Sequence, residues 1–331
     1  MPITLKHGLR TAVMAAAASA LLTGGVLAQE LKMLSSWSPA NKGTYITEVA
    51  FMKLVEEETK GRQKVRRSGP EAVPPFEQVQ PVAAGVFDIL ITHGAYHSGT
   101  TAMGMSWDAV NADPEKRRSS GLWEPYDKHY QKLGLKALAF VPQGHSGYHM
   151  VLRQPIGPDG GLKGRKIRGT VTYHPLIRGL GGAPVVIPGG EVYAALEKGV
   201  VDGAAWPTLG ALDLKWHEVA KHYVRPSFGV STLLIFINNN RWKKLSEADQ
   251  AALLEAGKKV ELQIFREFDG LAKEEEEALK KRGMSEVRFS PENQAKVGKL
   301  WEEGLWELAR KKHGKEADAM RKAVADAKLG M

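Results

Sequence analysis

The stretch that decides the fold is ELKMLSSWSPANKGTYITEVAFMKLVEEETKGRQKVRR, residues 30–67. Its apolar start, Glu30 to Ser36, predicts a strand, and the apolar residues between Thr44 and Lys60 lie close to one face of a helix. Gly61 stands where a left-handed cap would end that helix, and a second strand follows over Gln63 to Arg67. Strand–helix–strand units of this kind imply a largely parallel sheet covered on both faces. The sequence therefore predicts an α/β fold.

A second pattern occurs twice, as VAAGVFDI over residues 82–89 and as ALEKGVVDG over residues 195–203. In both copies a helix ends at a glycine, two hydrophobic residues begin a strand, and an aspartate lies near its start. Ligands of open α/β sheets bind outside the carboxyl ends of the strands. We therefore expect the segments after these two strands, which carry His93 and Trp206, to face each other across a cleft.

The chain has 331 residues, more than a single hydrophobic core usually supports, so we expect two lobes. The strand expected at 148–153 crosses from lobe I to lobe II, and the apolar run at 228–238 crosses back. The expected division assigns 29–151 plus about 238–285 to lobe I, and 152–237 plus about 286–331 to lobe II.

A helical pattern begins at the N-cap residue Ser246 and continues to Arg282. About 37 residues at a rise of 1.5 Å make a rod of roughly 55 Å, longer than one lobe. Such a helix would lean on both lobes behind a hinge. The alternative, two helices broken at Asp269-Gly270, stays open at this stage.

The first 28 residues resemble a signal peptide. Lys6 and Arg10 form a basic lead, Thr11 to Leu22 is an alanine-rich apolar run, and Val26 to Ala28 offers the small residues that a signal peptidase reads. Cleavage after Ala28 would give an exported, periplasmic protein. An uncleaved anchor helix remains the alternative, although the run is weakly apolar for a membrane span.

Composition excludes several classes of protein. Hydrophobic residues make up 43% and charged residues 25%, as in ordinary globular proteins. The absence of cysteine excludes disulfides, thiolate metal sites and a cysteine nucleophile. The net charge of +9 comes from scattered basic clusters without interleaved aromatic residues, so we expect no nucleic-acid partner.

Motifs for catalysis or metal binding are missing. The two histidines in HEVAKH, residues 217–222, are five apart and diverge around a helix, unlike those of a zinc protease. Two further pairs have a spacing of four: His93/His97 and His145/His149. Both pairs lie in segments that favour loop or strand and have no neighbouring carboxylate, so we expect no metal. We also expect no enzyme, because no phosphate loop, dinucleotide motif or nucleophile elbow is present.

Two residues carry recognition chemistry. Arg168 ends the predicted strand 166–168, where its planar guanidinium could hold a carboxylate by two parallel hydrogen bonds. Trp206 lies at the equivalent edge of the second repeat, where its indole could stack on a ligand. A surface position for the arginine and core packing for the tryptophan are the open alternatives.

Several spaced motifs together resemble a known family. They are GLKGRKIR, LGGAPVVI and EVYAALEKGVVDG between Gly161 and Pro207, INNNRWKKL at 237–245, and V-x-x-x-T-x-G-R at 55–62. In this order they resemble the solute-binding proteins of TRAP (tripartite ATP-independent periplasmic) transporters, of the DctP family. The resemblance implies a periplasmic binding protein-like fold: two α/β lobes around a central cleft, joined by crossing strands and spanned by a long helix. It also implies a small organic acid as ligand and membrane permease subunits as partners, with no ATP chemistry.

The resemblance also suggests roles for particular residues. Arg168 matches the arginine that clamps the ligand carboxylate, and Trp206 matches an aromatic residue of a subgroup that takes keto or hydroxy acids. In that subgroup a glutamine and a glutamate help to hold a metal ion, whereas His149 and Ala205 occupy these positions here, which argues against a metal. No arginine lies at 145–147, where sialic-acid members have their second one, so sialic acid is not the expected ligand.

The remaining candidates for the cleft are aromatic or neutral at pH 7: Trp37, His93, Tyr96, His145, Tyr148 and His149. One fixed positive charge among rings suits a monocarboxylate, aromatic or bearing a hydroxyl or keto group, better than a dicarboxylate. We therefore expect an extracytoplasmic solute receptor. A ligand-sensing subunit for a receptor kinase, and a secreted enzyme that uses His93, His97 or His145 with an aspartate on an organic acid, are the alternatives.

Overall fold

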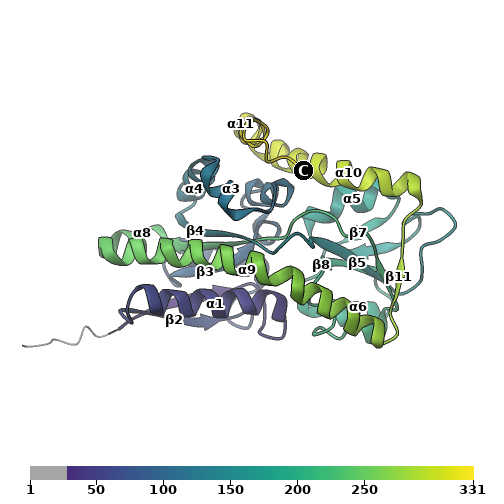
Figure 1. Cartoon of the computed structure of the whole chain (residues 1–331), viewed down its shortest axis with the longest axis horizontal. Coiled ribbons are helices and arrows are strands. Elements are labelled where there is room, and N and C mark those ends of the chain that lie inside the picture. Colours follow the sequence, from purple (N-terminus) through teal and green to yellow (C-terminus); the bar gives the residue numbers. More distant parts are fainter. Residues whose placement is uncertain (1–27) are drawn as a thin grey trace, which may run out of the picture.

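The structure is a computed structural model that describes residues 28–331. The expected signal peptide, residues 1–28, therefore lies outside the described residues except for Ala28. The described chain forms two lobes, each built around its own sheet and both covered by helices (Figure 1), which confirms the two-lobed α/β fold.

The first lobe contains a five-stranded sheet in the order β2-β1-β3-β10-β4. Its strands are β1 (Gln29–Ser35), β2 (Gln63–Ser68), β3 (Ile89–His93), β4 (Leu135–Pro142) and β10 (Thr232–Asn238). Strand β1 pairs in parallel with β2 and β3, and β10 runs antiparallel between β3 and β4. The helices of this lobe are α1 (Lys42–Glu58), α2 (Val79–Ala83), α3 (Pro114–Ser119), α4 (Trp123–Gln131) and α8 (Asn239–Lys244).

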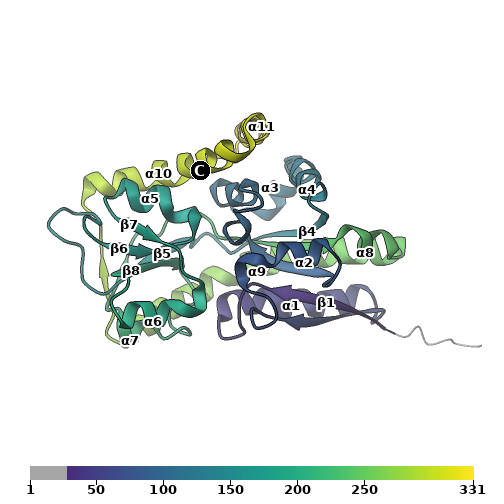
Figure 2. The same cartoon turned by 180° about the vertical axis from the view of Figure 1, so that it is seen from behind.

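The second lobe contains a six-stranded sheet in the order β11-β9-β5-β8-β6-β7. Its strands are β5 (Tyr148–Leu152), β6 (Lys166–Arg168), β7 (Ala183–Val185), β8 (Gly203–Pro207), β9 (His222–Val224) and β11 (Ser285–Val287). Its helices are α5 (His174–Gly179), α6 (Val192–Glu197) and α7 (Trp216–Val219), seen best from behind in Figure 2.

The repeated pattern holds the same place in both lobes. The Asp88 carboxylate accepts a hydrogen bond of 2.8 Å from the backbone N–H of Lys32, at the start of β3. The Asp202 carboxylate accepts one of 2.8 Å from the N–H of Lys166, at the start of β8. In both lobes the repeated aspartate therefore fixes the start of a strand to its parallel neighbour, and the carboxyl end of that strand points toward the other lobe.

The crossings between lobes differ from the expected boundaries. All five residues of β5 pair with β8 in the second sheet, and β10 lies entirely in the first sheet. The chain therefore crosses at 143–147 and again at 225–231, and not at 151/152 and 237/238. Gly144 and Gly147 have φ values of 61° and 58°, so the backbone turns between β4 and β5 instead of continuing as one strand.

The long helix is confirmed as one element, α9 (Glu247–Lys281), without a break at Asp269-Gly270. Its N-cap is Ser246, whose hydroxyl accepts a hydrogen bond of 3.1 Å from the N–H of Asp249. The helix packs on α1 and β4 and continues along the second lobe, as Figure 1 shows. In the part of the chain that the structure describes, no helix has the length and apolar character that a membrane span requires.

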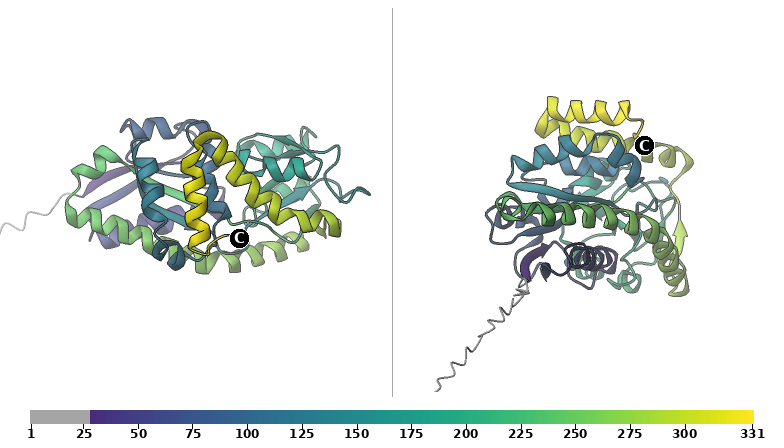
Figure 3. Two further views of the ribbon diagram at one scale, coloured as in Figure 1. Left: turned by 90° about the horizontal axis from the view of Figure 1, so that it is seen from above. Right: turned by 60° about the vertical axis from the view of Figure 1, so that its left-hand side comes forward.

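The C-terminal segment is shared by both lobes, contrary to its expected assignment to lobe II. Helix α10 (Pro291–His313) packs against α5 of the second lobe and against the 3₁₀ segment η3 (Met103–Ala109) of the first. Helix α11 (Lys315–Asp326) then lies over the first lobe, as the view from above in Figure 3 shows. The Leu329 carbonyl accepts a hydrogen bond of 2.8 Å from the N–H of Asn111, which holds the C-terminus there.

Candidate ligand-binding site

A cavity, here called the inner cavity, lies between the two lobes. Its walls come from the carboxyl ends of strands in both sheets and from the crossing segments. The lining residues are Trp37, Thr44, His93, Tyr96, Gln143, Tyr148, Arg168, Thr170, Tyr173, Trp206, Pro207, Ser231 and Leu233. This set contains six of the eight candidates named from the sequence, all except His145 and His149.

Arg168 provides the one formal charge among the described residues that line the inner cavity. Its side chain is fully buried at the end of β6. The guanidinium donates 2.8 Å from Nε to the Ile187 carbonyl and 3.1 Å from Nη1 to the Ala205 carbonyl. Its Nη2 has no hydrogen-bond partner within residues 28–331. A buried charge with a free donor is costly unless an anion reaches it, so the site favours an anionic ligand.

Trp206 forms the wall beside this guanidinium, with its ring 4.9 Å from the Arg168 Cζ. Two glycines make room for the indole: a Cβ on Gly189 would lie 2.6 Å from its Cη2, and one on Gly210 would lie 2.8 Å from its Nε1. The far edge of the indole contacts Trp216, with ring centroids 5.3 Å apart. Trp206 is therefore held in one orientation against the arginine.

His93 and Tyr148 also line the cavity and share one buried carboxylate. Asp108 Oδ2 lies 2.7 Å from His93 Nε2 and accepts a hydrogen bond of 2.8 Å from the Tyr148 hydroxyl. His93 Nδ1 accepts a hydrogen bond from the N–H of Ala95, so the ring proton sits on Nε2 and is donated to Asp108. Burial, with the Asp108 charge adding to it, raises the pKa of Tyr148 well above its usual value. Both histidine nitrogens are thus engaged, which removes the lone pair that a general base would need.

Trp37 and Tyr96 complete the first-lobe side. The indole Nε1 of Trp37 donates a hydrogen bond of 3.1 Å to the Tyr96 hydroxyl, and the two rings meet edge to face. The Arg67 guanidinium donates to the Trp37 carbonyl and fixes this loop after β1. The rings of the first lobe that line the inner cavity, those of Trp37, His93 and Tyr96, therefore have polar atoms that already contact protein partners.

The structure does not bring His145 and His149 into the inner cavity. The His145 side chain is 67% exposed, and its Nδ1 lies 3.2 Å from Asp269 of the long helix. His149 is fully buried, and its Nδ1 accepts a hydrogen bond of 3.1 Å from Arg225 Nη1. Burial, reinforced by the Arg225 charge, lowers the pKa of His149 well below its usual value. Neutral His149 therefore carries its proton on Nε2.

Some lining residues were missed from the sequence. Thr170 and Tyr173 follow β6 and could have been found by the rule that identified Trp206, since both come after the carboxyl end of a strand. Burial raises the pKa of Tyr173 well above its usual value, although the Arg168 charge opposes this. Thr44, Gln143 and Ser231 have no local signal, because only the meeting of the lobes brings them to the cavity.

The inner cavity does not fit a metal ion. No carboxylate is among its described lining residues. At the two positions that hold a metal in the resembling subgroup, Ala205 offers no ligand atom and the free nitrogen of His149 carries a proton. We derive no role for a metal there.

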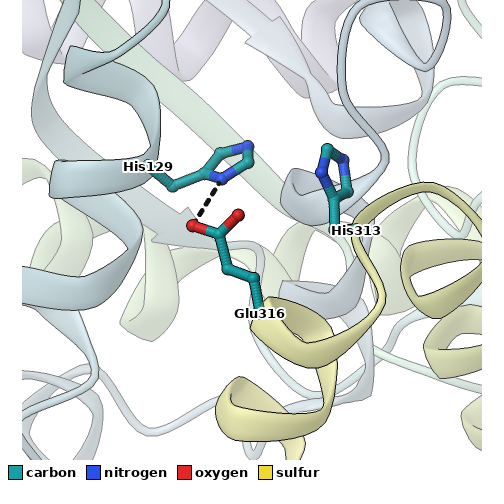
Figure 4. A group of neighbouring side chains, drawn as sticks. All are labelled: His129, His313 and Glu316. Carbon is teal, nitrogen blue, oxygen red and sulfur yellow. Dashed lines mark ion pairs between the residues drawn. The ribbon is translucent and has the colours of Figure 1, made fainter.

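A separate group of three possible metal ligands lies near the C-terminus: His129, His313 and Glu316 (Figure 4). The His313 Nε2 accepts a hydrogen bond of 3.1 Å from the N–H of Ala102, so this nitrogen is engaged. One Glu316 oxygen lies 3.1 Å from His129 Nδ1 and 3.1 Å from Lys132 Nζ. These contacts join the start of α11 to α4. The three side chains therefore anchor the C-terminal helix.

Two contacts hold the loop that follows Trp206. Glu275 of α9 accepts hydrogen bonds of 2.7 Å from the N–H of Gly210 and 3.0 Å from the N–H of Leu212. Burial raises the pKa of Glu275 to about 7, because the two N–H groups offset the loss of solvation only in part. Asp213 of the same loop forms an ion pair of 2.8 Å with Lys42 at the start of α1 in the first lobe. This ion pair joins the loop after Trp206 in the second lobe to the first lobe.

The sequence of this chain is similar to those of known bacterial proteins. The family described as bacterial extracellular solute-binding protein, family 7 (DctP), matches residues 34–312. A monocarboxylate 2-oxoacid-binding periplasmic protein of Nostoc sp. is 28% identical over 86% of this chain and 83% of its own length.

Solved structures share the fold. A TRAP periplasmic solute-binding protein from Desulfovibrio salexigens with bound orotic acid has a TM-score of 0.80 at 20% identity, over 90% of this chain and 98% of its own. A TRAP transporter solute-binding protein from Bordetella bronchiseptica, with copurified calcium and picolinate in one site, has a TM-score of 0.77 at 23% identity, over 91% of both chains.

Proposed function

The chain belongs to the DctP family of bacterial extracellular solute-binding proteins, and we propose that it is a receptor for a small organic monocarboxylate, which it delivers to a TRAP permease. Solute-binding proteins of this class bind small organic ligands outside the cytoplasm and work with membrane permease subunits. What remains to be proposed for this chain is the ligand, the residues that hold it and the particular permease that receives it.

One observation carries the proposal: the Arg168 guanidinium lies at the inner cavity with a free Nη2. Its other two nitrogens are held by backbone carbonyls, so the fork has a fixed orientation before any ligand arrives. A carboxylate can accept from such a fork through two oxygens, and a charge-assisted bond of this kind is stronger than a neutral one. We assign the ligand carboxylate to Arg168 and its apolar body to the rings of Trp206, Trp37, Tyr96 and Tyr173.

The lining favours one negative charge on the ligand. Arg168 is the one cation among the described lining residues, and Asp108 lies directly behind His93 and Tyr148. A second carboxylate would be buried without a charged partner and close to this aspartate, which is costly. A monocarboxylate, aromatic or bearing a hydroxyl or keto group, meets neither penalty.

Binding would proceed by closure of the lobes around the ligand. Arg168 and Trp206 belong to the second lobe, whereas Trp37, His93 and Tyr96 belong to the first. A ligand that contacts both sets stabilises the closed form more than the open one and shifts the population toward it. The crossings at 143–147 and 225–231 are the segments that would bend.

The test is calorimetric titration of the mature protein with benzoate, lactate and succinate. We expect binding of at least one monocarboxylate and little or no binding of succinate; tight succinate binding would overturn the proposed ligand class. Mass spectrometry of the recovered acid checks the role, because a receptor releases its ligand unchanged whereas an enzyme would convert it.

A further inference from the structure

Two buried polar side chains near Gly210 have no hydrogen-bond partner within residues 28–331. Asn41 is 3% exposed, and neither its Oδ1 nor its Nδ2 forms a hydrogen bond. It precedes α1 at the N-cap position, yet its side chain does not cap the helix. Trp206 is 4% exposed, and its Nε1 also lacks a partner. Buried polar atoms without partners are rare, because each costs free energy, and they mark places where a ligand can bind.

These groups lie close together. A Cβ added to Gly210 would lie 2.8 Å from Trp206 Nε1 and 3.2 Å from Asn41 Oδ1, so the two atoms are at most 6.0 Å apart. One ligand atom placed between them, away from the Gly210 backbone, can therefore be within hydrogen-bond distance of both. Gly210, with φ at 127° and its N–H held by Glu275, has no Cβ to fill the space beside these atoms.

Asn41 and Trp206 also line a second space, here called the outer groove. Trp37 and Trp206 line both this groove and the inner cavity, so the two spaces adjoin at these residues. Glu77 and Glu191 also line the outer groove. Their charges disfavour a second anionic group on the ligand at this end.

The chemistry of the two atoms selects a functional group. The indole Nε1 can only donate and the amide Oδ1 can only accept. A hydroxyl group satisfies both, because its oxygen accepts from Trp206 while its hydrogen is donated to Asn41. A carboxylate oxygen would face Oδ1 without a proton, and an ammonium group could not accept from Nε1. We propose that Asn41 and Trp206 Nε1 form a second subsite that binds a hydroxyl group of the ligand, so that the solute is a hydroxy acid.

This subsite exists only when the lobes are together. Asn41 lies in the first lobe, whereas Trp206 and Gly210 lie in the second. The Lys42–Asp213 ion pair joins the same two segments one residue further along α1. A hydroxyl bound there would bridge the lobes, and the loss of this bridge would weaken closure. The proposal rests on the assignment of the ligand carboxylate to Arg168, and it adds a second subsite that holds the hydroxyl group of the same ligand.

The experiment compares matched acids by calorimetry: lactate with propanoate, 4-hydroxybutanoate with butanoate, and 4-hydroxybenzoate with benzoate. The mature wild-type protein should bind the hydroxylated member of at least one pair about tenfold or more tightly, since the buried donor and acceptor are left unpaired without it. In Asn41→Leu, which keeps the size but loses the hydrogen bonds, this advantage should fall below about threefold. Asn240→Leu, the same substitution at an exposed position of α8 away from the groove, is the control and should keep it.

Equal affinities within every pair, or an advantage that persists in Asn41→Leu, would overturn the proposal. Should Asn41→Leu fail to fold, Asn41→Ala removes the same polar atoms without adding bulk, and the same result is expected. Should none of the six acids bind, mass spectrometry of the ligand that copurifies decides. An acid with a hydroxyl group supports the subsite and an acid without one overturns it, whereas a ligand without a carboxylate overturns the proposed function itself.

Discussion

Two deeply buried arginines lie against tryptophan rings but have different roles. Arg117 is in the first lobe and Arg168 is in the second. Arg117 is 3% exposed and Arg168 is fully buried. Their Cζ atoms lie 5.1 Å and 4.9 Å from the rings of Trp107 and Trp206. Neither burial nor aromatic contact distinguishes them.

Their hydrogen bonds do distinguish them. All three nitrogens of Arg117 donate to the protein: to the carbonyls of Asn111, Trp107 and Val110 and to the hydroxyl of Thr232. Burial lowers the pKa of Arg117 to about 10, while Asp108 and Glu261 oppose the shift. Arg168 keeps a free Nη2 at a cavity. A guanidinium saturated by its own chain is part of the core, whereas one with a free donor at a cavity is a candidate for binding.

Replacement of the saturated arginine should have the largest effect. Arg117→Leu leaves three carbonyls and a hydroxyl without their donor, and removes the positive charge near buried Asp108 and Glu261. We expect the free energy of unfolding to fall by about 3–5 kcal/mol, measured by denaturant titration. Where the variant folds, its affinity for the carboxylate should be unchanged. An unaltered free energy of unfolding would contradict the structural role assigned to Arg117.

Replacement of the unsaturated arginine should act on binding. Arg168→Ala should lower the affinity for the carboxylate ligand by roughly 2–5 kcal/mol, because the bound anion would lose its charged partner. Its stability without ligand should fall less than that of Arg117→Leu, because only two carbonyls, those of Ile187 and Ala205, lose their donor and a buried charge with a free donor is removed. Calorimetry measures the first effect and thermal unfolding the second. Near-normal affinity in this variant would refute the assignment of the carboxylate.

Glu275 holds the loop that follows Trp206, and its raised pKa predicts a pH dependence of stability. Its pKa of about 7 in the folded protein, against 4.5 for an ordinary glutamate, means that the folded state binds more protons between these values. Stability should therefore fall as the pH rises from about 4.5 to 7 and level off above it, by up to about 3 kcal/mol from this group.

In Glu275→Gln this part of the pH dependence should be absent from the unfolding free energies, whereas Glu274→Gln, on the exposed side of the same helix, should retain it. An identical pH profile for wild type and Glu275→Gln would exclude the raised pKa.

The ion pair between the lobes should have the smallest effect. The Lys42 side chain is 71% exposed and that of Asp213 is 14% exposed. Partly exposed pairs of this kind contribute at most about 1 kcal/mol and are weakened by salt. Lys42→Ala should therefore lower ligand affinity by about fivefold or less, and the difference from wild type should shrink as the salt concentration rises. A salt-independent loss would point to packing instead of charge.

Much of this molecule could be read from local sequence. The helix and strand periods, the cap at Ser246 and the glycines after helices depend on neighbours along the chain, so the α/β elements and the unbroken helix over Glu247–Lys281 were predictable. The repeat at 82–89 and 195–203 marked two strand ends, and the residues named after them, His93 and Trp206, both line the inner cavity, as does Arg168 at the end of the strand 166–168.

The tertiary structure decided what depends on partners distant in sequence. Asp108 is 15 residues from His93 and 40 from Tyr148, and only the meeting of the lobes shows that it binds both. His149 was a candidate by residue type, and Arg225, 76 residues away, holds its ring nitrogen. Residue type and the spacing of apolar residues along the chain determine which donors and acceptors each element carries. Hydrogen bonds, however, form only between atoms about 3 Å apart in space. Which donors remain free for a ligand is therefore set by the folded chain.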